Sequence, residues 1–364
     1  MKICILTQPL GTNYGCILQA YALQKVLTDM GHDVTTLRFR ADITWVPSGY
    51  KKYLLTIRRF ISKYIKGNKS IICCNPDNQT QFAYQELDRF VSERMHCLAV
   101  KPPLNKKNLP SFDAYIVGSD QVWRPEYSPF LPNFYLDFLG DTPAKRIAYA
   151  ASFGVDTWEA DDSMTERIRP LAKKFDAVTV RETSGVTLCE KYLGVKAEVM
   201  PDPTFLLTAK DYLALFSPSN KKKAPYIAAY ILDRGEVIQS MIDRVSADLG
   251  LPVKYIGLLD WAKKTDALES WLEDIYQASF VITNSFHGTV FSIIFEKDFL
   301  SISNNRRGAS RFMSLLESVG LQDQLIREEM LDHCPLSYHR PDYTKARVVL
   351  RGLREQGLSF LSLI

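Results

Sequence analysis

Short apolar runs alternate with amphipathic stretches along most of the chain, which is the pattern of strands and helices in alternation. Residues 2–7 have the pattern of a short buried strand, residues 16–30 carry apolar side chains at helical spacing, and residues 33–37 again have the pattern of a strand. Gly31, between the last two segments, fits the end of a helix. A strand, a glycine-bearing loop, a helix and a second strand form a βαβ unit, and this unit predicts a parallel sheet.

The alternation restarts after residues 217–225, a stretch rich in Ser, Pro, Asn and Lys that is the clearest linker in the chain. Before the linker, the pattern predicts a helix at 79–94 and strands at 113–117, 146–152, 177–180 and 198–201. After the linker, it predicts strands at 226–232, 253–258, 280–283 and 299–302, with helices at 235–249, 267–277, 288–296 and 311–319.

The length of 364 residues favours two domains. We therefore predict an α/β protein with two doubly wound, Rossmann-like lobes that face each other across a cleft. The expected N-terminal lobe covers residues 1–216 and contains a basic helical insertion at about 40–110. The expected C-terminal lobe covers residues 224–340, and residues 341–364 are expected to form a terminal helix.

The composition is that of a folded, intracellular protein. Hydrophobic residues make up 46% and charged residues 24%, which excludes disorder over most of the length. The net charge of +4 is too small and too dispersed to favour nucleic-acid binding. The seven cysteines are odd in number and include no C-x-x-C pair, which indicates reduced thiols and a cytoplasmic location. We expect no signal peptide, membrane-spanning helix or metal site.

A histidine follows one of the predicted strands. In open α/β sheets, ligands bind at the carboxyl ends of the strands, and residues 284–289 follow the run 280–283. Ser285 and Gly288 stand at the start of the next helix, where backbone amides attract anions. His287 can transfer protons near neutral pH. The alternative is that Ser285 only caps the helix and His287 is a bonded surface histidine.

Four arginines also follow predicted strands. Arg306, Arg307 and Arg311 follow the run 299–302, and Arg181 follows the run 177–180. Guanidinium groups are the natural partners of phosphate and carboxylate, so these residues are candidates for binding an anionic substrate. The alternatives are a solvated basic loop in the first case and a structural contact with Glu182 in the second.

A third group of candidates follows the predicted strand 113–117. Trp123 offers a ring on which a sugar can stack, and Asp120 offers a carboxylate that can accept a proton from a hydroxyl. The alternative places Asp120 as a helix cap and Trp123 in the core. Residues 11–15 lack the glycine spacing of a dinucleotide-binding loop, and no P-loop motif is present.

Taken together, these segments resemble polysaccharide pyruvyltransferases. The resemblance covers roughly residues 1–325 and rests on residues 13–23, 118–123, 181–182, 202–204 and 284–288, which occur in the order expected for that family. It implies a fold similar to the two-lobed GT-B glycosyltransferases. It also implies transfer of a pyruvyl group from phosphoenolpyruvate to a sugar diol, with a cyclic ketal and phosphate as products. The acceptor would be a capsule or other surface polysaccharide, or its lipid-linked precursor.

The resemblance also assigns roles. In that family the histidine and the arginine at the positions of His287 and Arg181 are important for use of the donor. We expect His287 to act as general acid or phosphate ligand, and Asp120 to position or deprotonate the acceptor. The remaining donor contacts are expected from Ser285, Gly288, Arg306, Arg307 and Arg311, and the acceptor contacts from Asn13, Tyr14, Gln121 and Trp123. Phosphoenolpyruvate is a co-substrate, and no cofactor is expected.

Two other functions fit the same pattern. A glycosyltransferase that uses a nucleotide-sugar would share the two lobes and the basic cleft. A non-catalytic protein that binds a sugar or an anion would share the strand-end cations but would not need His287.

Residues 51–69 contain seven cations and no acidic residue, with apolar side chains at roughly helical spacing. A basic amphipathic helix of this kind can rest on an anionic membrane surface, where a lipid-linked acceptor would lie. The alternative is a solvated face packed on the N-terminal lobe.

If the helix docks on membranes, the protein will sediment with anionic liposomes in a salt-sensitive way, and replacing Arg58, Arg59 and Lys63 by Glu will weaken that binding. A protein that does not bind such liposomes would refute the hypothesis.

Overall fold

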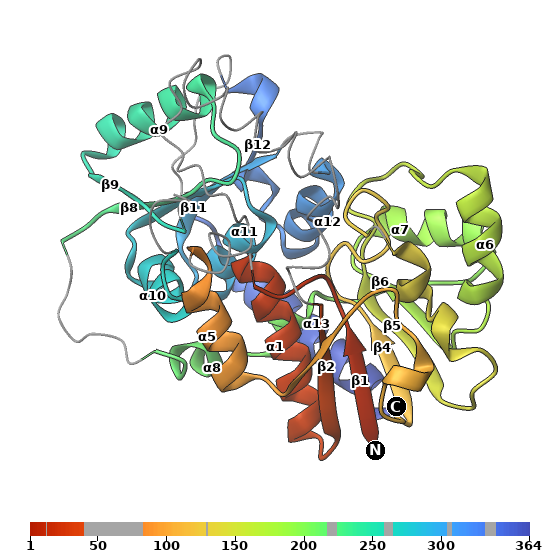
Figure 1. Ribbon diagram of the computed structural model, residues 1–364. Helices are drawn as coiled ribbons and strands as arrows, with labels where there is room; N and C mark the ends of the chain where they lie inside the picture. The colour runs from red at the N-terminus through yellow and green to blue at the C-terminus, as the bar shows by residue number, and fades with distance from the viewer. Residues whose placement is uncertain are drawn as a thin grey trace, which may run out of the picture.

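The alternating pattern folds into two separate parallel sheets, as the computed structural model shows (Figure 1). The structure describes residues 1–11, 13–39, 83–128, 130–216, 224–257, 265–303, 308–331 and 340–364. Every strand pairing among these residues is parallel. The predicted α/β class with two Rossmann-like lobes is therefore confirmed.

The first sheet has seven strands in the order β3-β2-β1-β4-β5-β6-β7. Its strands are β1 (Lys2–Leu6), β2 (Asp33–Phe39), β3 (Cys97–Val100), β4 (Ala114–Val117), β5 (Lys145–Ala151), β6 (Ala177–Val180) and β7 (Glu198–Val199). Its helices are α1 (Tyr14–Asp29), α5 (Gln85–Arg94), α6 (Asp162–Ala172), α7 (Thr183–Leu188) and α8 (Ala209–Leu213). We call this part the first lobe.

The second sheet has five strands in the order β12-β11-β10-β8-β9. Its strands are β8 (Ile227–Tyr230), β9 (Val253–Tyr255), β10 (Phe280–Thr283), β11 (Asp298–Ser303) and β12 (Leu325–Arg327). Its helices are α9 (Glu236–Leu249), α10 (Leu268–Gln277), α11 (Phe286–Ile294) and α12 (Ala309–Val319). We call this part the second lobe.

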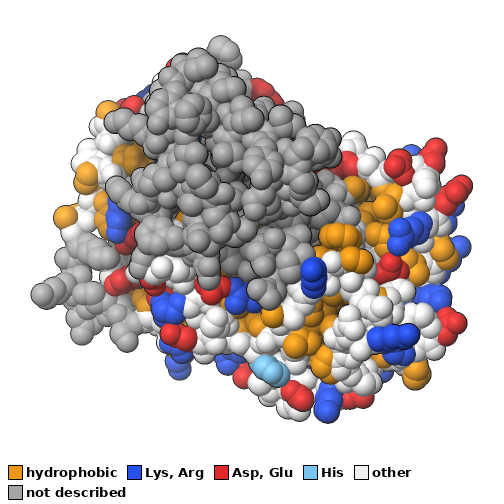
Figure 2. Space-filling view, in the orientation of Figure 1, with side chains coloured by type: hydrophobic (Ala, Val, Ile, Leu, Met, Phe, Trp, Pro, Cys, Tyr) orange, Lys and Arg blue, Asp and Glu red, His pale blue; other side chains and the backbone are white. Residues whose placement is uncertain are grey.

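Part of the expected insertion belongs to the first lobe itself. Helix α5 precedes β3, and β3 pairs with β2 at the edge of the first sheet. The four-residue run of β3 is too short to be recognised as a strand from its pattern alone. Residues 40–82, which include the basic segment 51–69, lie outside the described residues. On the face shown in Figure 2, the described Lys, Arg, Asp and Glu side chains are interspersed.

The two lobes meet through packed side chains. Tyr14, at the start of α1, stacks on Trp271 of α10 with ring centroids 5.1 Å apart, and its hydroxyl donates to the carbonyl oxygen of Asp266 at 2.8 Å. Tyr230 of β8 packs edge-on against the same Tyr14 ring. One hydrophobic core cluster therefore contains residues of both sheets. At α1 the two lobes therefore touch directly.

The C-terminal helix α13 (Tyr343–Ser362) connects the lobes a second time (Figure 1). Near its start, the Tyr343 hydroxyl donates to the carbonyl of Lys297 in the second lobe at 2.5 Å. Further along, the Arg354 guanidinium donates to the carbonyls of Phe205 and Leu207 in the first lobe. Among the described helices, none is both long and apolar enough to span a membrane.

The Tyr14 contacts predict how much the docking of the lobes contributes to stability. Replacing Tyr14 by Phe removes one hydrogen bond and should lower the free energy of unfolding by about 1 kcal/mol. Replacing it by Ala also removes the stacked ring and should cost about 3–5 kcal/mol, measured by urea denaturation. Tyr192→Phe is the control, because that ring stacks on Trp158 within the first lobe. A Tyr14→Ala variant as stable as this control would contradict the prediction.

Candidate active site

The carboxyl ends of strands from both sheets meet where the lobes join. Arg181 follows β6, Asp202 follows β7, and His287 lies in the first turn of α11 after β10. Nη1 of Arg181 lies 2.7 Å from Oδ2 of Asp202, and Nε2 of His287 lies 3.6 Å from the same oxygen. All three residues are at most 7% exposed. One buried carboxylate of the first lobe therefore contacts an arginine of its own lobe and a histidine of the other.

Asp202 is held in place by its own turn. Its Oδ1 accepts hydrogen bonds from the backbone N–H and the hydroxyl of Thr204, at 3.0 and 2.7 Å. Pro203 begins the short 3₁₀ helix that Asp202 caps, which suits the fixed φ of proline. Burial alone would raise the pKa of Asp202, but His287, Arg181 and Thr204 together hold it well below its usual range. Asp202 is therefore an anion at neutral pH.

His287 is positioned by a capped helix start and by a glycine of the other lobe. The Ser285 hydroxyl accepts from the backbone N–H of Gly288, which caps α11. The imidazole lies against Gly15 of α1, where the Cβ of any other residue would occupy the place of the ring. Nε2 of His287 is buried and makes no hydrogen bond. A buried nitrogen without a hydrogen bond is rare in folded proteins, and the nearest carboxylate oxygen, Oδ2 of Asp202, lies 3.6 Å away, so this nitrogen needs an explanation.

Gly288 has a structural role at the start of α11. A Cβ at this position would collide with the side chain of Thr283, the last residue of β10. The glycine allows α11 to pack closely on the strand that precedes it, and its N–H is occupied by Ser285. Ser285 and Gly288 thus shape the turn that carries His287.

Two guanidinium groups lie near one aromatic ring. Cζ of Arg181 is 4.6 Å from the centre of the Phe286 ring, and Cζ of Arg311 is 5.5 Å from it. Burial and the neighbouring Arg181 lower the pKa of Arg311 to about 10. Nε and Nη2 of Arg181 are buried and make no hydrogen bond. The site therefore holds two guanidinium groups in a desolvated place, and two nitrogens of Arg181 make no hydrogen bond, an arrangement that favours an anionic ligand.

Asp120 belongs to the same cluster. Its Oδ1 is 3.7 Å from Nη2 of Arg181, and its side chain is 16% exposed. It follows β4 in a turn with φ of 69°, a left-handed conformation that Asp tolerates better than most residues. No helix begins there, so the alternative interpretation of Asp120 as a helix cap is wrong. The structure thus brings Asp120, Arg181, Asp202, His287 and Arg311 together.

The other expected acceptor contacts have structural roles in this conformation. The Asn13 side chain accepts from Cys16 N and caps α1, and Tyr14 fills the junction between the lobes. Trp123 is 2% exposed, stacks on Tyr135 and donates its indole N–H to the carbonyl of Phe134. The Trp123 side chain therefore belongs to the core, which was the alternative interpretation. The Gln121 side chain accepts from Arg124. Arg306 and Arg307 lie outside the described residues.

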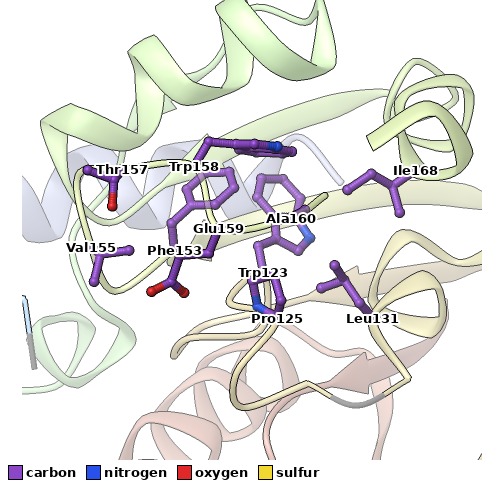
Figure 3. A pocket seen from close by; sticks show the side chains of 10 residues that line it. All are labelled: Trp123, Pro125, Leu131, Phe153, Val155, Thr157, Trp158, Glu159, Ala160 and Ile168. Atoms are coloured by element: carbon purple, nitrogen blue, oxygen red, sulfur yellow. The ribbon is translucent and has the colours of Figure 1, made fainter. Parts of the chain in front are cut away.

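A small hollow opens in the first lobe beside these residues (Figure 3). Phe153 contacts both tryptophans at its wall, with ring centroids 5.4 Å from Trp123 and 5.7 Å from Trp158. Figure 3 shows Val155 and Thr157 on one side of the hollow and Leu131 and Ile168 on the other. Of the expected site residues that the structure describes, only Trp123 lines it. The charged cluster around Asp202 is thus separate from this hollow.

Asp202 is the residue whose importance the sequence did not reveal. Residues 202–204 were part of the resemblance to polysaccharide pyruvyltransferases, but the resemblance assigned no role to Asp202. A signal in the sequence was available, because Asp202 lies within three residues of the end of a strand, as Arg181 and Asp120 do. In the described part of the chain, no three His, Cys, Asp or Glu residues gather in a way that could hold a metal ion.

Comparison with known proteins identifies the family. The model of the family described as polysaccharide pyruvyl transferase matches residues 13–306, which is most of the chain. The chain belongs to the polysaccharide pyruvyl transferase family. The matched range includes Arg181, Asp202 and His287, so the charged cluster lies within the part that this family shares.

Similarities to other proteins are more remote. No curated protein matches this pyruvyl transferase family member in sequence. The chain is similar to the UDP-GlcNAc 2-epimerase of Methanocaldococcus jannaschii, with 11% identity, a TM-score of 0.44, and coverage of 98% of this chain and 99% of that one. It is also similar to a glycosyltransferase from Rickettsia africae, with 12% identity, a TM-score of 0.41, and coverage of 100% and 96%. Such low scores carry no argument about function.

The depressed pKa of Asp202 predicts a pH-dependent effect of its removal. A carboxyl whose pKa is lower in the folded than in the unfolded protein stabilises the fold above its unfolded pKa of about 4, and this contribution fades as the pH falls. Asp202→Asn should therefore cost about 3–5 kcal/mol near pH 7 and clearly less below about pH 4, as measured by urea denaturation. Asp211→Asn, which removes a more exposed capping carboxylate of α8, serves as the control. An equal loss for Asp202→Asn at both pH values would refute this interpretation.

Proposed function

We propose that this protein transfers a pyruvyl group from phosphoenolpyruvate to a sugar diol, forming a cyclic ketal and releasing phosphate. The observation that carries the proposal is the cluster at the junction of the lobes. There Arg181 and Arg311 are buried close together, and the buried Nε2 of His287 makes no hydrogen bond. The membership in the polysaccharide pyruvyl transferase family supports the same reaction.

The donor carries a phosphate and a carboxylate, so it needs several cationic partners. Arg181 is well suited, because Nη1 is held by Asp202 while Nε and Nη2 remain for a ligand. Burial would lower the pKa of Arg181, but Asp202, Asp120 and Glu182 raise it, so the guanidinium stays charged. Arg311, in the first turn of α12, would contribute the second cation. Arg306 and Arg307, which precede α12 in the sequence, would contribute further cations.

The reaction requires three proton transfers, and the site residues would account for the first two. His287 would donate a proton to the methylene carbon of phosphoenolpyruvate, which creates a cationic centre at C2. The first sugar hydroxyl adds to C2 and loses its proton. This proton returns to His287, which is thereby reprotonated. A second hydroxyl then displaces the phosphate, and its proton leaves with the phosphate. Asp202 would orient His287 and stabilise its imidazolium form, as a carboxylate does in other acid–base pairs.

Asp120 would face the acceptor. It is the most exposed carboxylate of the cluster and lies within reach of Arg181. It would accept the proton of the attacking hydroxyl and pass it on toward His287. The acceptor is proposed to be a sugar of a surface polysaccharide or of its lipid-linked precursor, reached from the cytoplasmic side of the membrane.

The proposal predicts phosphate release when the protein is mixed with phosphoenolpyruvate and a galactose- or mannose-containing acceptor. His287→Ala should lower kcat/KM by about 100-fold or more, because general acids contribute a factor of roughly 10²–10⁴. The variant should still fold, but its melting temperature should fall because the buried Asp202 loses one of its partners, so the two activities are compared well below that temperature. His32→Gln is the control, since His32 lies at the amino end of β2, away from the site.

Two outcomes would overturn the assignment. Full activity of His287→Ala would show that this residue is not essential. In thermal-shift experiments, stabilisation by a nucleoside diphosphate but not by phosphoenolpyruvate would favour a glycosyltransferase that uses a nucleotide-sugar.

A further inference from the structure

Glu182 is a buried carboxylate that the proposed reaction does not use. It directly follows Arg181 and is 1% exposed. It occupies the N-cap position of α7, but its side chain makes no capping hydrogen bond to that helix. Burying a carboxylate is costly unless it is well satisfied, so its contacts need an explanation.

The carboxylate binds the segment that follows β5. Oε1 of Glu182 accepts from the hydroxyl of Ser152 at 3.0 Å, from the N–H of Phe153 at 2.7 Å and from the N–H of Gly154 at 3.2 Å. The Ser152 hydroxyl in turn accepts from the N–H of Gly154. Glu182 thus fixes residues 152–154 to the end of β6, beside Arg181.

Residues 152–154 contact the helix that carries Arg311. The carbonyl of Gly154 lies so close to Gly308 that a Cβ on Gly308 would collide with it, and Gly308 has a φ of +81° that favours glycine. Gly308 is the N-cap of α12, which bears Arg311 in its first turn. A second contact joins the start of α7, next to Glu182, to the same helix α12, because the hydroxyls of Thr183 and Ser314 lie 3.2 Å apart.

Glu182 also acts on the arginines through its charge. Burial and Arg181 lower the pKa of Arg311, whereas Glu182 and Asp120 act in the opposite direction. The charged groups that face one another here are therefore Arg181 and Arg311 on one side, and Asp120, Asp202 and Glu182 on the other.

We propose that Glu182 is a positioning residue for the donor site. It fixes residues 152–154 against Gly308 and so determines where α12 holds Arg311 relative to Arg181. This inference rests on the proposed function only in that the two arginines are taken to bind the donor.

The test compares Glu182→Ala with Glu182→Gln in two measurements. Backbone hydrogen exchange, followed by mass spectrometry, reports on residues 152–155 and 308–314. Steady-state kinetics report KM for phosphoenolpyruvate and kcat separately. Asp176→Asn is the matched control, because that carboxylate accepts from Arg146 N at the opposite end of β5.

We expect Glu182→Ala to speed exchange in both segments and to raise KM for phosphoenolpyruvate about tenfold, with a smaller change in kcat. Glu182→Gln keeps an oxygen that accepts the same three hydrogen bonds, so it should restore slow exchange and most of the affinity. Asp176→Asn should leave both segments and KM unchanged. If Glu182→Ala does not fold, Ser152→Ala removes one of the three donors and should speed exchange in both segments to a smaller extent.

Unchanged exchange at 308–314 in Glu182→Ala, or in Ser152→Ala if it is used instead, would overturn the proposal. A Glu182→Gln variant as defective as Glu182→Ala would also overturn it, since charge rather than hydrogen bonding would then be the cause. If the unmodified protein does not release phosphate from phosphoenolpyruvate, the proposed function fails, while the exchange comparison still decides the role of Glu182.

Discussion

The buried carboxylate of Asp202 is the interaction on which the arrangement of this protein depends. A charge removed from water is stable only with close partners of opposite charge and further hydrogen bonds. Asp202 obtains them from Arg181 and Thr204 in its own lobe and from His287 in the other. The docking of the lobes is therefore tied to the electrostatics of the site, because separating the lobes would remove one of these partners.

Steric constraints at the junction act together with this charge. The imidazole of His287 takes the space that a side chain at Gly15 would fill, and Gly154 meets Gly308 in the same way across the junction. In both contacts the backbone of one lobe touches an atom of the other lobe. Even the methyl group of an alanine at Gly15 or Gly308 would therefore push the two lobes apart. The stacked rings of Tyr14 and Trp271 add apolar area beside them. The way in which the two lobes dock thus depends on these glycines as much as on the aromatic side chains.

Much of this could be predicted from the sequence, for a clear physical reason. Asp120 and Arg181 follow strands of the first sheet and His287 follows a strand of the second, and parallel strands bring such positions to one edge of each sheet. The sequence could not separate a ligand contact from a cap or a core residue. Asn13 and Trp123 have the residue types of sugar contacts, yet one caps α1 and the other is buried among aromatic rings. The contact between Asp202 and His287 depends on how two sheets dock, which no local pattern records.

The division of the site between the lobes links stability to chemistry. The first lobe supplies Arg181 and the carboxylates, and the second supplies His287 and Arg311, so neither lobe holds the cluster alone. Helix α13 strengthens this dependence, because Tyr343 bonds to the second lobe and Arg354 to the first. A substitution far from the cluster, at α13 or at Tyr14, would change the separation of Asp202 and His287 without touching either. Effects of such substitutions on catalysis should therefore follow their effects on the docking of the lobes.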